Sequence, residues 1–216
     1  MRSVQHWTSK YIKDRLALMV YERSNPGHPW LTRAMIEILD TWLQSSDTGL
    51  EFGSGRSTRW FAKRVGHLTS VEHNPEWFRI VSGQLASLRG NGVDYRLCED
   101  GDADSATTSY VKVASAIAQE SLDFCLIDGV ARDHCALATL DRLKPGGILI
   151  IDNVNWYMPR TLKSLAPNSR GHEDGYSSDV WCEVGRRLAS WRRIWTTNGV
   201  WDSALWVKPY GRSTHP

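Results

Sequence analysis

The stretch that decides the fold is Thr48-Gly-Leu-Glu-Phe-Gly-Ser-Gly-Arg-Ser-Thr58, followed shortly by Leu68-Thr-Ser-Val-Glu72. Residues 49–52 are short and apolar and predict a buried strand. Residues 53–55 predict a turn, and residues 57–65 have the composition and spacing of a helix. Residues 68–72 predict a second strand that ends on an acid. The sequence here therefore indicates a strand, a glycine turn, a helix and a strand.

The two glycines and the final acid of this stretch indicate a ligand site. Gly53 and Gly55 would let the backbone turn tightly and approach a ligand where a Cβ atom would collide. Glu72 lies about 20 residues beyond the turn, where an acid can accept hydrogen bonds from ribose hydroxyls. We therefore expect a site for a molecule that carries adenosine.

The residues around the turn distinguish between two kinds of adenosine ligand. A dinucleotide site favours G-x-G-x-x-G, and here Thr58 stands at the third glycine position. Glu51 precedes the first glycine by two residues, and its carboxylate would repel a pyrophosphate and suit a cationic ligand. An ordinary turn that happens to contain two glycines is the alternative interpretation.

Length and composition predict one domain without a nucleic-acid or membrane partner. The chain has 216 residues, enough for one α/β domain with a sizeable core. Its net charge of +2 gives no electrostatic footprint for nucleic acid or a membrane surface. No segment reaches the roughly 18 apolar residues of a membrane span, and no signal peptide is recognisable. The four cysteines lack metal-type pair spacing, which favours reduced thiols in a cytoplasmic protein (Cys98, Cys125, Cys135 and Cys182).

Two helices are expected before the first strand. Residues 4–23 carry an apolar stripe at helical spacing, and a second helix is predicted from Pro29 to about Gln44. We expect these helices, within residues 1–45, to cover the sheet or to form part of a lid. Residues 46–210 would then form the ligand-binding core of a single domain that spans residues 1–216.

The remainder of the chain alternates strands and helices and then ends in a hairpin. Strands are predicted at residues 93–98, 121–128 and 148–153, with helices between them. Residues 191–197 and 203–208 are two strands joined through Asn198 and Gly199 without a helix, so they should pair antiparallel. The predicted fold class is α/β, with a Rossmann-like, doubly wound, mostly parallel seven-stranded sheet and a C-terminal antiparallel hairpin.

Acidic residues follow several of these strands. Ligands of open α/β sheets bind beyond the carboxyl ends of the strands, so an acid after residues 93–98 could accept a hydrogen bond from an adenine amino group. Asp100 and Asp102 are both candidates, and a solvated acidic loop is the alternative.

Five segments together resemble class I S-adenosylmethionine-dependent methyltransferases in their order and spacing. They are Glu51-Phe-Gly-Ser-Gly55, Ser70-Val-Glu-His73, Leu126-Ile-Asp-Gly129, Leu143-Lys-Pro-Gly-Gly147 and Ile151-Asp-Asn153. The resemblance implies S-adenosylmethionine as cofactor, its amino-acid part near Glu51, Gly53 and Gly55, and its ribose on Glu72. It also implies cofactor contacts in the same region from Ser54, His73 and Asp128.

The second part of the resemblance concerns a metal. Asp128 and the pair Asp152-Asn153 end two strands that should be neighbours, and such oxygen ligands suit Mg²⁺ or another divalent ion. This arrangement resembles the catechol-type O-methyltransferases, in which a metal binds vicinal hydroxyls and lowers the pKa of the attacking one. Those enzymes place a lysine base shortly after the first acid. Here Arg132 and His134 follow instead, and His134 or Asp128 is the candidate base. The alternative is that the two acids cap loops without metal.

The sequence thus predicts a methyltransferase that acts on a small molecule, at a hydroxyl oxygen, and that could form a homodimer. Residues 154–179 form a long segment rich in aromatic and basic residues, and we expect them to form a substrate lid or a surface loop. Trp156 and Trp201 should lie near the rim of the active site. An aminopropyltransferase-like enzyme and a catalytically silent, cofactor-binding scaffold are the alternatives.

Overall fold

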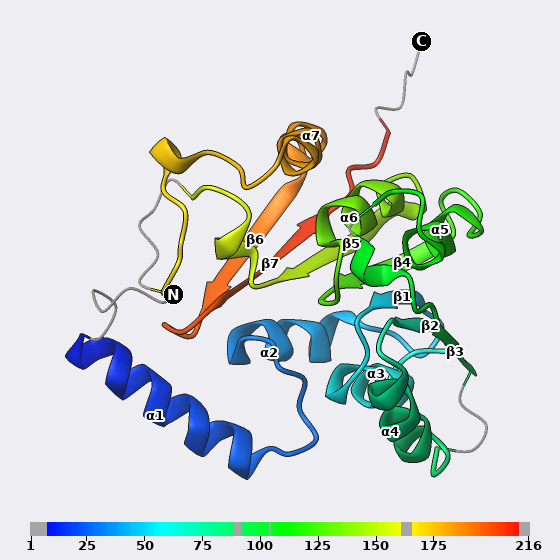
Figure 1. Cartoon of the computed structure of the whole chain (residues 1–216), viewed down its shortest axis with the longest axis horizontal. Helices are drawn as coiled ribbons and strands as arrows, with labels where there is room; N and C mark the ends of the chain where they lie inside the picture. Colours follow the sequence, from blue (N-terminus) through cyan, green and yellow to red (C-terminus); the bar gives the residue numbers. More distant parts are fainter. Residues whose placement is uncertain (1–7, 89–91, 104, 161–165, 212–216) are drawn as a thin grey trace.

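The computed structural model describes residues 8–88, 92–103, 105–160 and 166–211, and its centre is one seven-stranded sheet (Figure 1). The strand order is β3-β2-β1-β4-β5-β7-β6. The first five strands pair parallel, whereas β7 is antiparallel to both β5 and β6, as the predicted fold class requires. The strands are β1 Thr48–Phe52, β2 His67–Glu72, β3 Gly92–Leu97, β4 Leu122–Ile127, β5 Leu143–Asp152, β6 Arg192–Thr197 and β7 Asp202–Val207.

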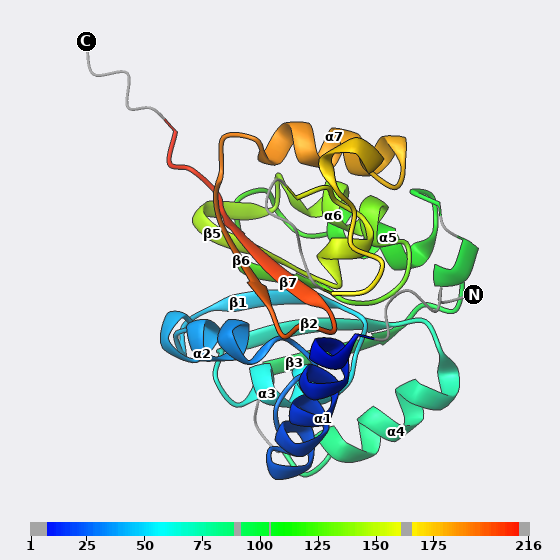
Figure 2. The same ribbon diagram turned by 90° about the vertical axis from the view of Figure 1, so that its left-hand side faces the viewer.

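Helices cover both faces of this sheet (Figure 2). On one side lie α1, α2, α3 and α4, and on the other lie α5, α6 and α7. This is the doubly wound arrangement that parallel crossover connections produce. The α-helices are α1 Ser9–Ser24, α2 Arg33–Trp42, α3 Arg56–Ala62, α4 Pro75–Leu85, α5 Ser109–Ser115, α6 Arg132–Thr139 and α7 Asp179–Leu188, and the 3₁₀ turns are η2 Gly101–Ala103, η3 Val154–Trp156 and η4 His172–Asp174.

Each face of the sheet has its own hydrophobic core. One core joins α2 and α3 to the sheet through buried residues such as Met35, Phe61 and Phe124. The other joins α5, α6 and α7 to the opposite face, with Tyr110 and Trp181 among its members. Because the central strands are buried on both faces, most of their residues are apolar, which is why the sequence reveals them clearly.

The first helix was expected to cover the sheet or to form part of a lid, and its apolar stripe does not pack on the sheet. α1 begins after Thr8, whose hydroxyl accepts a hydrogen bond from the Tyr11 amide. Leu18 is its one buried residue among those described, and the predicted apolar stripe is exposed, including Leu16 (56%) and Val20 (64%). α2 behaves as predicted, with Met35, Ile36 and Leu39 buried against the sheet.

β5 and the part of the chain after it contain features that the sequence did not predict. Residues 144–147 belong to β5, where the register shifts and Gly146 has a φ of +81°. The segment after Asn153 contains η3 and η4, and of the expected lid the residues 161–165 lie outside the described part. Helix α7 was not predicted, although its apolar residues recur at helical spacing.

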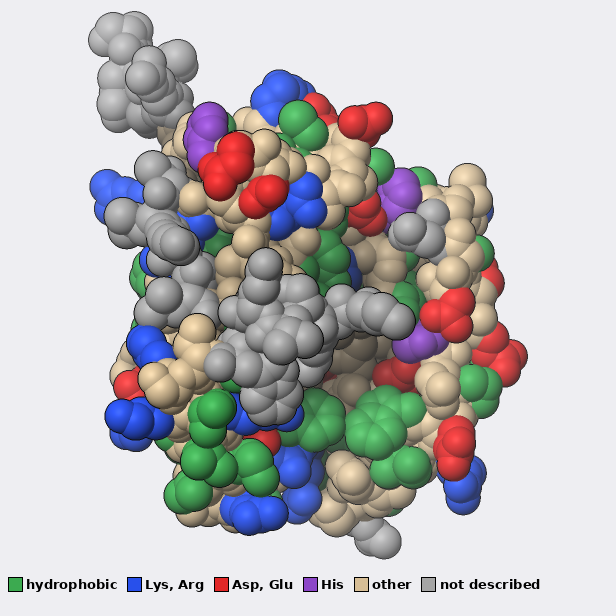
Figure 3. All heavy atoms as spheres, turned by 60° about the vertical axis from the view of Figure 1, so that its left-hand side comes forward, with side chains coloured by type: hydrophobic (Ala, Val, Ile, Leu, Met, Phe, Trp, Pro, Cys, Tyr) green, Lys and Arg blue, Asp and Glu red, His purple; other side chains and the backbone are tan. Residues whose placement is uncertain are grey.

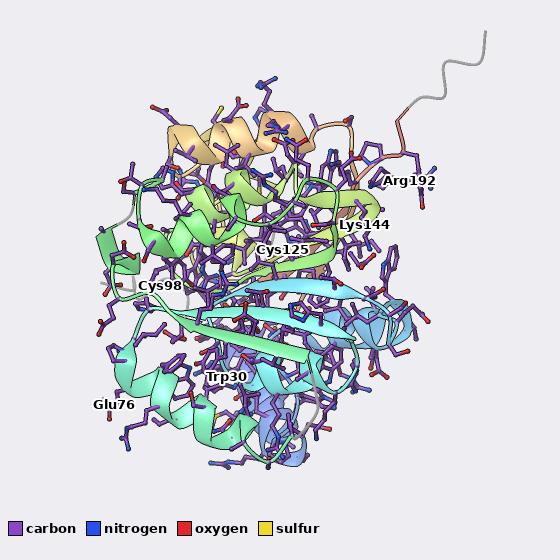
Figure 4. The ribbon with its side chains drawn as sticks, turned by 90° about the vertical axis from the view of Figure 1, so that its right-hand side faces the viewer. Trp30, Glu76, Cys98, Cys125, Lys144 and Arg192 are labelled. Carbon is purple, nitrogen blue, oxygen red and sulfur yellow. The ribbon has the colours of Figure 1, made fainter. Side chains whose placement is uncertain are left out.

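All four cysteines are free thiols, and Cys125 lies within the sheet (Figure 4). Among the described residues, no helix is both long enough and apolar enough to cross a membrane.

The contact between β1 and β4 gives a test of the fold. Gly49 pairs with Phe124, and a Cβ atom on Gly49 would lie 2.0 Å from the Phe124 ring. Gly49→Ala should therefore lower the free energy of unfolding by about 1–3 kcal/mol, measured by urea denaturation. Gly83→Ala is the matched control, because nothing lies within 4 Å of its Cβ position in α4. The control should be neutral or stabilising by up to about 1 kcal/mol. Equal stability of the two variants would contradict this packing.

Candidate functional site

Two cavities lie at the carboxyl ends of the central strands and adjoin each other. The first, which we call the glycine-turn cavity, has a volume of about 650 Å³ and lies over the turn after β1. The second, the tryptophan cavity, has a volume of about 380 Å³ and lies between α1, the end of β5 and the β6–β7 turn. Trp30 and Asp128 line both cavities. Figure 3 shows this region of the surface hollowed beside a group of hydrophobic side chains, with acidic and histidine side chains along the rim.

Glu51 is a fully buried acid at the end of β1. Its Oε2 accepts hydrogen bonds from Thr58 Oγ1 and Ser70 Oγ, both at 2.6 Å. Its Oε1 is buried without a partner among the described residues. Burial raises the pKa of Glu51 to about 7, although the hydroxyls bonded to it act in the opposite direction. Glu51 is not among the residues that line the two cavities, but a cationic donor that reached Oε1 would favour the charged form of this carboxyl group.

The two glycines of the turn have different roles. Gly53 has a φ of +92°, and a Cβ atom there would lie 2.5 Å from the Gly129 nitrogen, so the fold itself requires glycine. Gly55 has no such restriction: its nearest neighbour would be the Trp77 ring, at 3.9 Å. Gly53 thus has a conformation that requires glycine, whereas a Cβ atom on Gly55 would make an ordinary contact with the Trp77 ring.

Glu72 lines the glycine-turn cavity, but its oxygens already accept hydrogen bonds from the protein. Oε2 accepts from the Ser54 hydroxyl at 2.6 Å and from the Ser54 amide at 3.2 Å. Oε1 accepts from the His73 and Asn74 amides, each at 2.9 Å. A ribose hydroxyl would therefore take the position of Ser54 Oγ, which is also within 2.7 Å of Tyr95 Oη.

The residues to compare here are His73, expected as a cofactor contact, and the two acids expected near the adenine, Asp100 and Asp102, and one of the three lines the cavity. His73 does so, and its Nε2 lies 3.3 Å from Asp102 Oδ1. Asp100 caps α5 instead, where it accepts hydrogen bonds from the Ser109 amide and hydroxyl, both at 2.6 Å. Those hydrogen bonds lower the pKa of Asp100. Neither Asp100 nor Asp102 is among the residues that line the two cavities, so the structure does not bring them into the predicted site.

The three predicted metal ligands lie together, but around an arginine. The Arg132 guanidinium donates from Nη2 to Asp128 Oδ1 at 3.0 Å and to the Asp128 carbonyl at 2.8 Å. From Nη1 it donates to the Asp152 carbonyl at 2.6 Å and to Asn153 Oδ1 at 3.3 Å. Its Nε donates to the Gly129 carbonyl at 2.8 Å. A permanently charged side chain thus occupies the middle of the predicted metal site.

The acids around Arg132 are also arranged unlike a set of metal ligands. Asp152 is 3% exposed, and its Oδ1 accepts a hydrogen bond from Ser203 Oγ. Burial, followed by the charge of Asp128, raises the pKa of Asp152 well above its ordinary value. In the described part of the chain no cluster of three or more His, Cys, Asp or Glu side chains could hold a metal ion. The residues present therefore do not fit a divalent ion while Arg132 occupies this position.

The structure separates the two candidate bases. Asp128 lies at the junction of the two cavities, with its side chain 22% exposed. His134 is the third residue of α6, and it is not among the residues that line either cavity.

Several residues of the site were not expected from the sequence. Arg132 is the most important of them, and the signal available was a basic residue four positions after Asp128. Trp30, Arg15 and Glu22 come from the N-terminal region, where no motif indicated a site. Trp156 and Trp201, expected near the rim, line the tryptophan cavity.

Comparison with known proteins agrees with this geometry. Residues 50–154 match a protein family described as a methyltransferase domain, which confirms the resemblance stated above. A comparison with curated proteins finds no match.

Solved structures with the same fold cover most of the chain. A methyltransferase-like protein from Silicibacter pomeroyi is 20% identical, with a TM-score of 0.53 over 87% of this chain and 91% of that one. A putative caffeoyl-CoA O-methyltransferase from Staphylococcus aureus is 14% identical, with a TM-score of 0.55 over 94% of both chains. A putative methyltransferase from Streptococcus mutans, solved with S-adenosylhomocysteine, is 12% identical, with a TM-score of 0.53 over 80% and 94%. At these identities the likeness establishes the fold.

The buried Glu51 gives a test that needs no ligand. Burial raises the pKa of Glu51 from its ordinary value of 4.5 to about 7, so the native state binds the proton more tightly and loses stability as the pH rises through this interval. Glu51→Gln has no carboxyl group to titrate at this position, so the variant does not lose this stability as the pH rises. From pH 5 to pH 8 the free energy of unfolding of the variant should therefore rise relative to wild type by on the order of 2–3 kcal/mol. Urea denaturation of both proteins measures this free energy of unfolding. A difference between the two proteins that does not change with pH would contradict the raised pKa of Glu51.

Proposed function

We propose that this chain, in which residues 50–154 form a methyltransferase domain of the class I fold, transfers the methyl group of S-adenosylmethionine to a hydroxyl oxygen of a small molecule. The observation that carries the proposal is the junction of the two cavities at Trp30 and Asp128. A methyl transfer needs a donor and an acceptor in adjoining sites, and both volumes lie within the roughly 300–1,000 Å³ range of small-molecule sites.

The glycine-turn cavity is the proposed cofactor site. The unpartnered Oε1 of Glu51 suits the cationic amino group of the cofactor. A Cβ atom on Gly55 would meet nothing nearer than the Trp77 ring, at 3.9 Å, and we assign the amino-acid part of the cofactor to a position close to this backbone. We assign Glu72 and His73, which line the cavity, to the ribose and the purine side respectively.

The tryptophan cavity is the proposed acceptor site. Trp30, Trp156 and Trp201 give it flat aromatic walls, which suit a planar acceptor. The indole N–H groups of Trp156 and Trp201 are buried without partners among the described residues, so they can donate to oxygens of the acceptor. Arg15 of α1 adds a positive charge at the same cavity.

Asp128 is the proposed base. The acceptor oxygen forms a bond to the methyl carbon while the bond from that carbon to sulfur breaks, so the sulfonium becomes a neutral thioether. The hydroxyl proton passes to the Asp128 carboxylate, which borders both reactants. The protein contributes mainly the alignment of the two molecules.

The same proposal includes the domain bounds, the cellular compartment and the oligomeric state. We assign one domain to residues 1–216, with α1 and the segment around η3 forming the walls of the acceptor site. The four free thiols suit a reducing compartment such as the cytoplasm. The exposed apolar stripe of α1 suits a homodimer.

Calorimetry with S-adenosylhomocysteine tests the cofactor site. At pH 6 the unliganded Glu51 holds a proton, so binding of a cationic amino group should release close to one proton, and at pH 8 almost none. Titrations in two buffers of different ionisation enthalpy measure this number. The release at pH 6 should disappear in Glu51→Gln. Absence of binding at both pH 6 and pH 8 would refute the cofactor proposal.

Gly55→Ala tests the close approach of the cofactor to the backbone. Its Cβ meets nothing nearer than 3.9 Å in the protein, so the melting temperature should stay close to that of wild type. The affinity for S-adenosylhomocysteine should fall roughly 10-fold or more, about 1.4 kcal/mol. Unchanged affinity would place the ligand elsewhere.

Asp128→Asn tests the transfer step. With a panel of aromatic alcohols and labelled S-adenosylmethionine, kcat should fall by about 10²–10⁴-fold, and the affinity for S-adenosylhomocysteine should be retained. Asp123→Asn, at the opposite end of the same strand, is the matched control. A propylamine product from decarboxylated cofactor would indicate an aminopropyltransferase instead, and binding without turnover on the whole panel would indicate a silent scaffold.

A further inference from the structure

The predicted metal site contains a cation that belongs to the chain itself. We propose that Arg132 is the resident cation of this site, that it replaces a divalent metal, and that it is a positioning residue which holds Asp128 at the junction of the two cavities. The proposal rests on the proposed function for its catalytic meaning, but its central claim concerns only which cation these oxygens bind.

The hydrogen bonds of Arg132 account for its whole donor capacity. A guanidinium has five N–H groups, and all five have an oxygen acceptor here. Those oxygens belong to the ends of β4 and β5 and include side-chain oxygens of two of the three predicted metal ligands, Asp128 and Asn153. The third, Asp152, contributes its carbonyl. The same end of the sheet that would coordinate an ion therefore surrounds the guanidinium.

The surroundings of the side chain keep it charged and in place. Arg132 is 12% exposed, and its Cζ lies 5.7 Å from the centre of the Tyr157 ring. Burial acts to lower the pKa of Arg132, but the charges of nearby groups, Asp128 foremost, outweigh it and raise that pKa. A divalent ion would have to displace this guanidinium and leave a positive charge buried without its partners, which is costly.

The backbone explains how the guanidinium reaches the site. Ala131 has a left-handed conformation, with a φ of +44°, and α6 begins at Arg132. The side chain then returns to the carbonyls of Asp128 and Gly129, the two residues that follow β4. The turn between β4 and α6 is thus closed by the residue that occupies the site.

This arrangement restricts what the acceptor can be. Since every N–H of Arg132 is used, the guanidinium has no donor left for the acceptor. Asp128 Oδ1 is held by Arg132, and among the described residues no hydrogen bond involves Oδ2, which leaves that oxygen for the acceptor hydroxyl. One hydroxyl is then sufficient, and a vicinal pair, which a metal would chelate, is not required.

Binding of Mn²⁺, followed by electron paramagnetic resonance, tests the claim without any need for activity. Wild-type protein should show no stoichiometric Mn²⁺ site. Arg132→Ala removes the guanidinium from among the oxygens, so it should bind one Mn²⁺, and Arg132→Ala combined with Asp128→Asn should lose that site. Arg186→Ala is the matched control, because that arginine is exposed on α7 and pairs only locally with Glu183. It should behave as wild type.

Methyl transfer gives the second readout. Wild-type turnover should be unaffected by EDTA. Arg132→Ala should lower kcat by about 10²-fold with the KM for S-adenosylmethionine little changed, and Mg²⁺ or Mn²⁺ should restore part of the loss. Arg132→Lys keeps the positive charge but not the five donors of the planar guanidinium. Its kcat should therefore lie between those of wild type and Arg132→Ala, and it should bind no Mn²⁺.

Three results would overturn the proposal. One is a stoichiometric Mn²⁺ site in the wild type, another is loss of wild-type turnover in EDTA, and the third is a folded Arg132→Ala without a Mn²⁺ site. If Arg132→Ala does not fold, the measurements on the wild type and on Arg132→Lys still show whether the site holds Arg132 or a divalent metal. If the wild type neither binds S-adenosylhomocysteine nor turns over, the proposed function fails, whereas the Mn²⁺ titrations still report which cation the site holds.

Discussion

The candidate site depends on the close approach of two backbone turns, one after β1 and the other after β4. Gly53 lies with its Cβ position 2.5 Å from the Gly129 nitrogen, and Gly129 in turn lies against the Tyr110 hydroxyl, so no side chain could be accommodated between them. This contact brings the end of β4 beside the glycine-turn cavity. Asp128, the residue before Gly129, consequently borders both cavities. The position of every other group in the site is set relative to this junction.

Three acids surround the junction, Glu51 and Asp152 buried and Asp128 partly exposed, and each is stabilised in a different way. Glu51 receives hydroxyl hydrogen bonds on one oxygen, with the other unpartnered in the described structure. Asp128 is paired with a guanidinium, and Asp152 is bonded to Ser203. Isolated buried carboxylates are unfavourable, so such groups need partners or lose their charge. Asp152 ties β5 to β7 through Ser203, and the partners of Glu51 and Asp128 agree with the different tasks proposed for them, a cationic ligand for the first and a proton for the second.

The sequence predicts the parts of this arrangement that are local. The glycine turn, the two acids after β1 and β2, and the apolar central strands can all be recognised because short-range spacing and burial on both faces determine them. The features that the sequence did not predict depend on contacts between residues that are far apart in the chain. The apolar stripe of α1 suggested a buried helix, yet no neighbouring element covers that stripe among the described residues. The acids at residues 128 and 152 suggested a metal, because nothing in the linear order shows that the side chain of Arg132 turns back between two strand ends. Asp100 likewise proved to cap α5, a role that depends on the fold of the intervening loop.

The manner in which α1 is attached has a consequence for how such a protein can diversify. α1 contributes Tyr11, Arg15 and Glu22 to the tryptophan cavity, whereas it buries only Leu18 among its described residues. Its attachment to the rest of the chain includes Asp14 beside Gly199 and Tyr21, which packs against the edge of the core below the sheet and is hydrogen-bonded to His28. The wall of one cavity is therefore encoded by a module whose sequence the central sheet hardly constrains. Evolution, or a protein engineer, can rewrite that module and so alter ligand preference without disturbing the scaffold that supports the glycine turn.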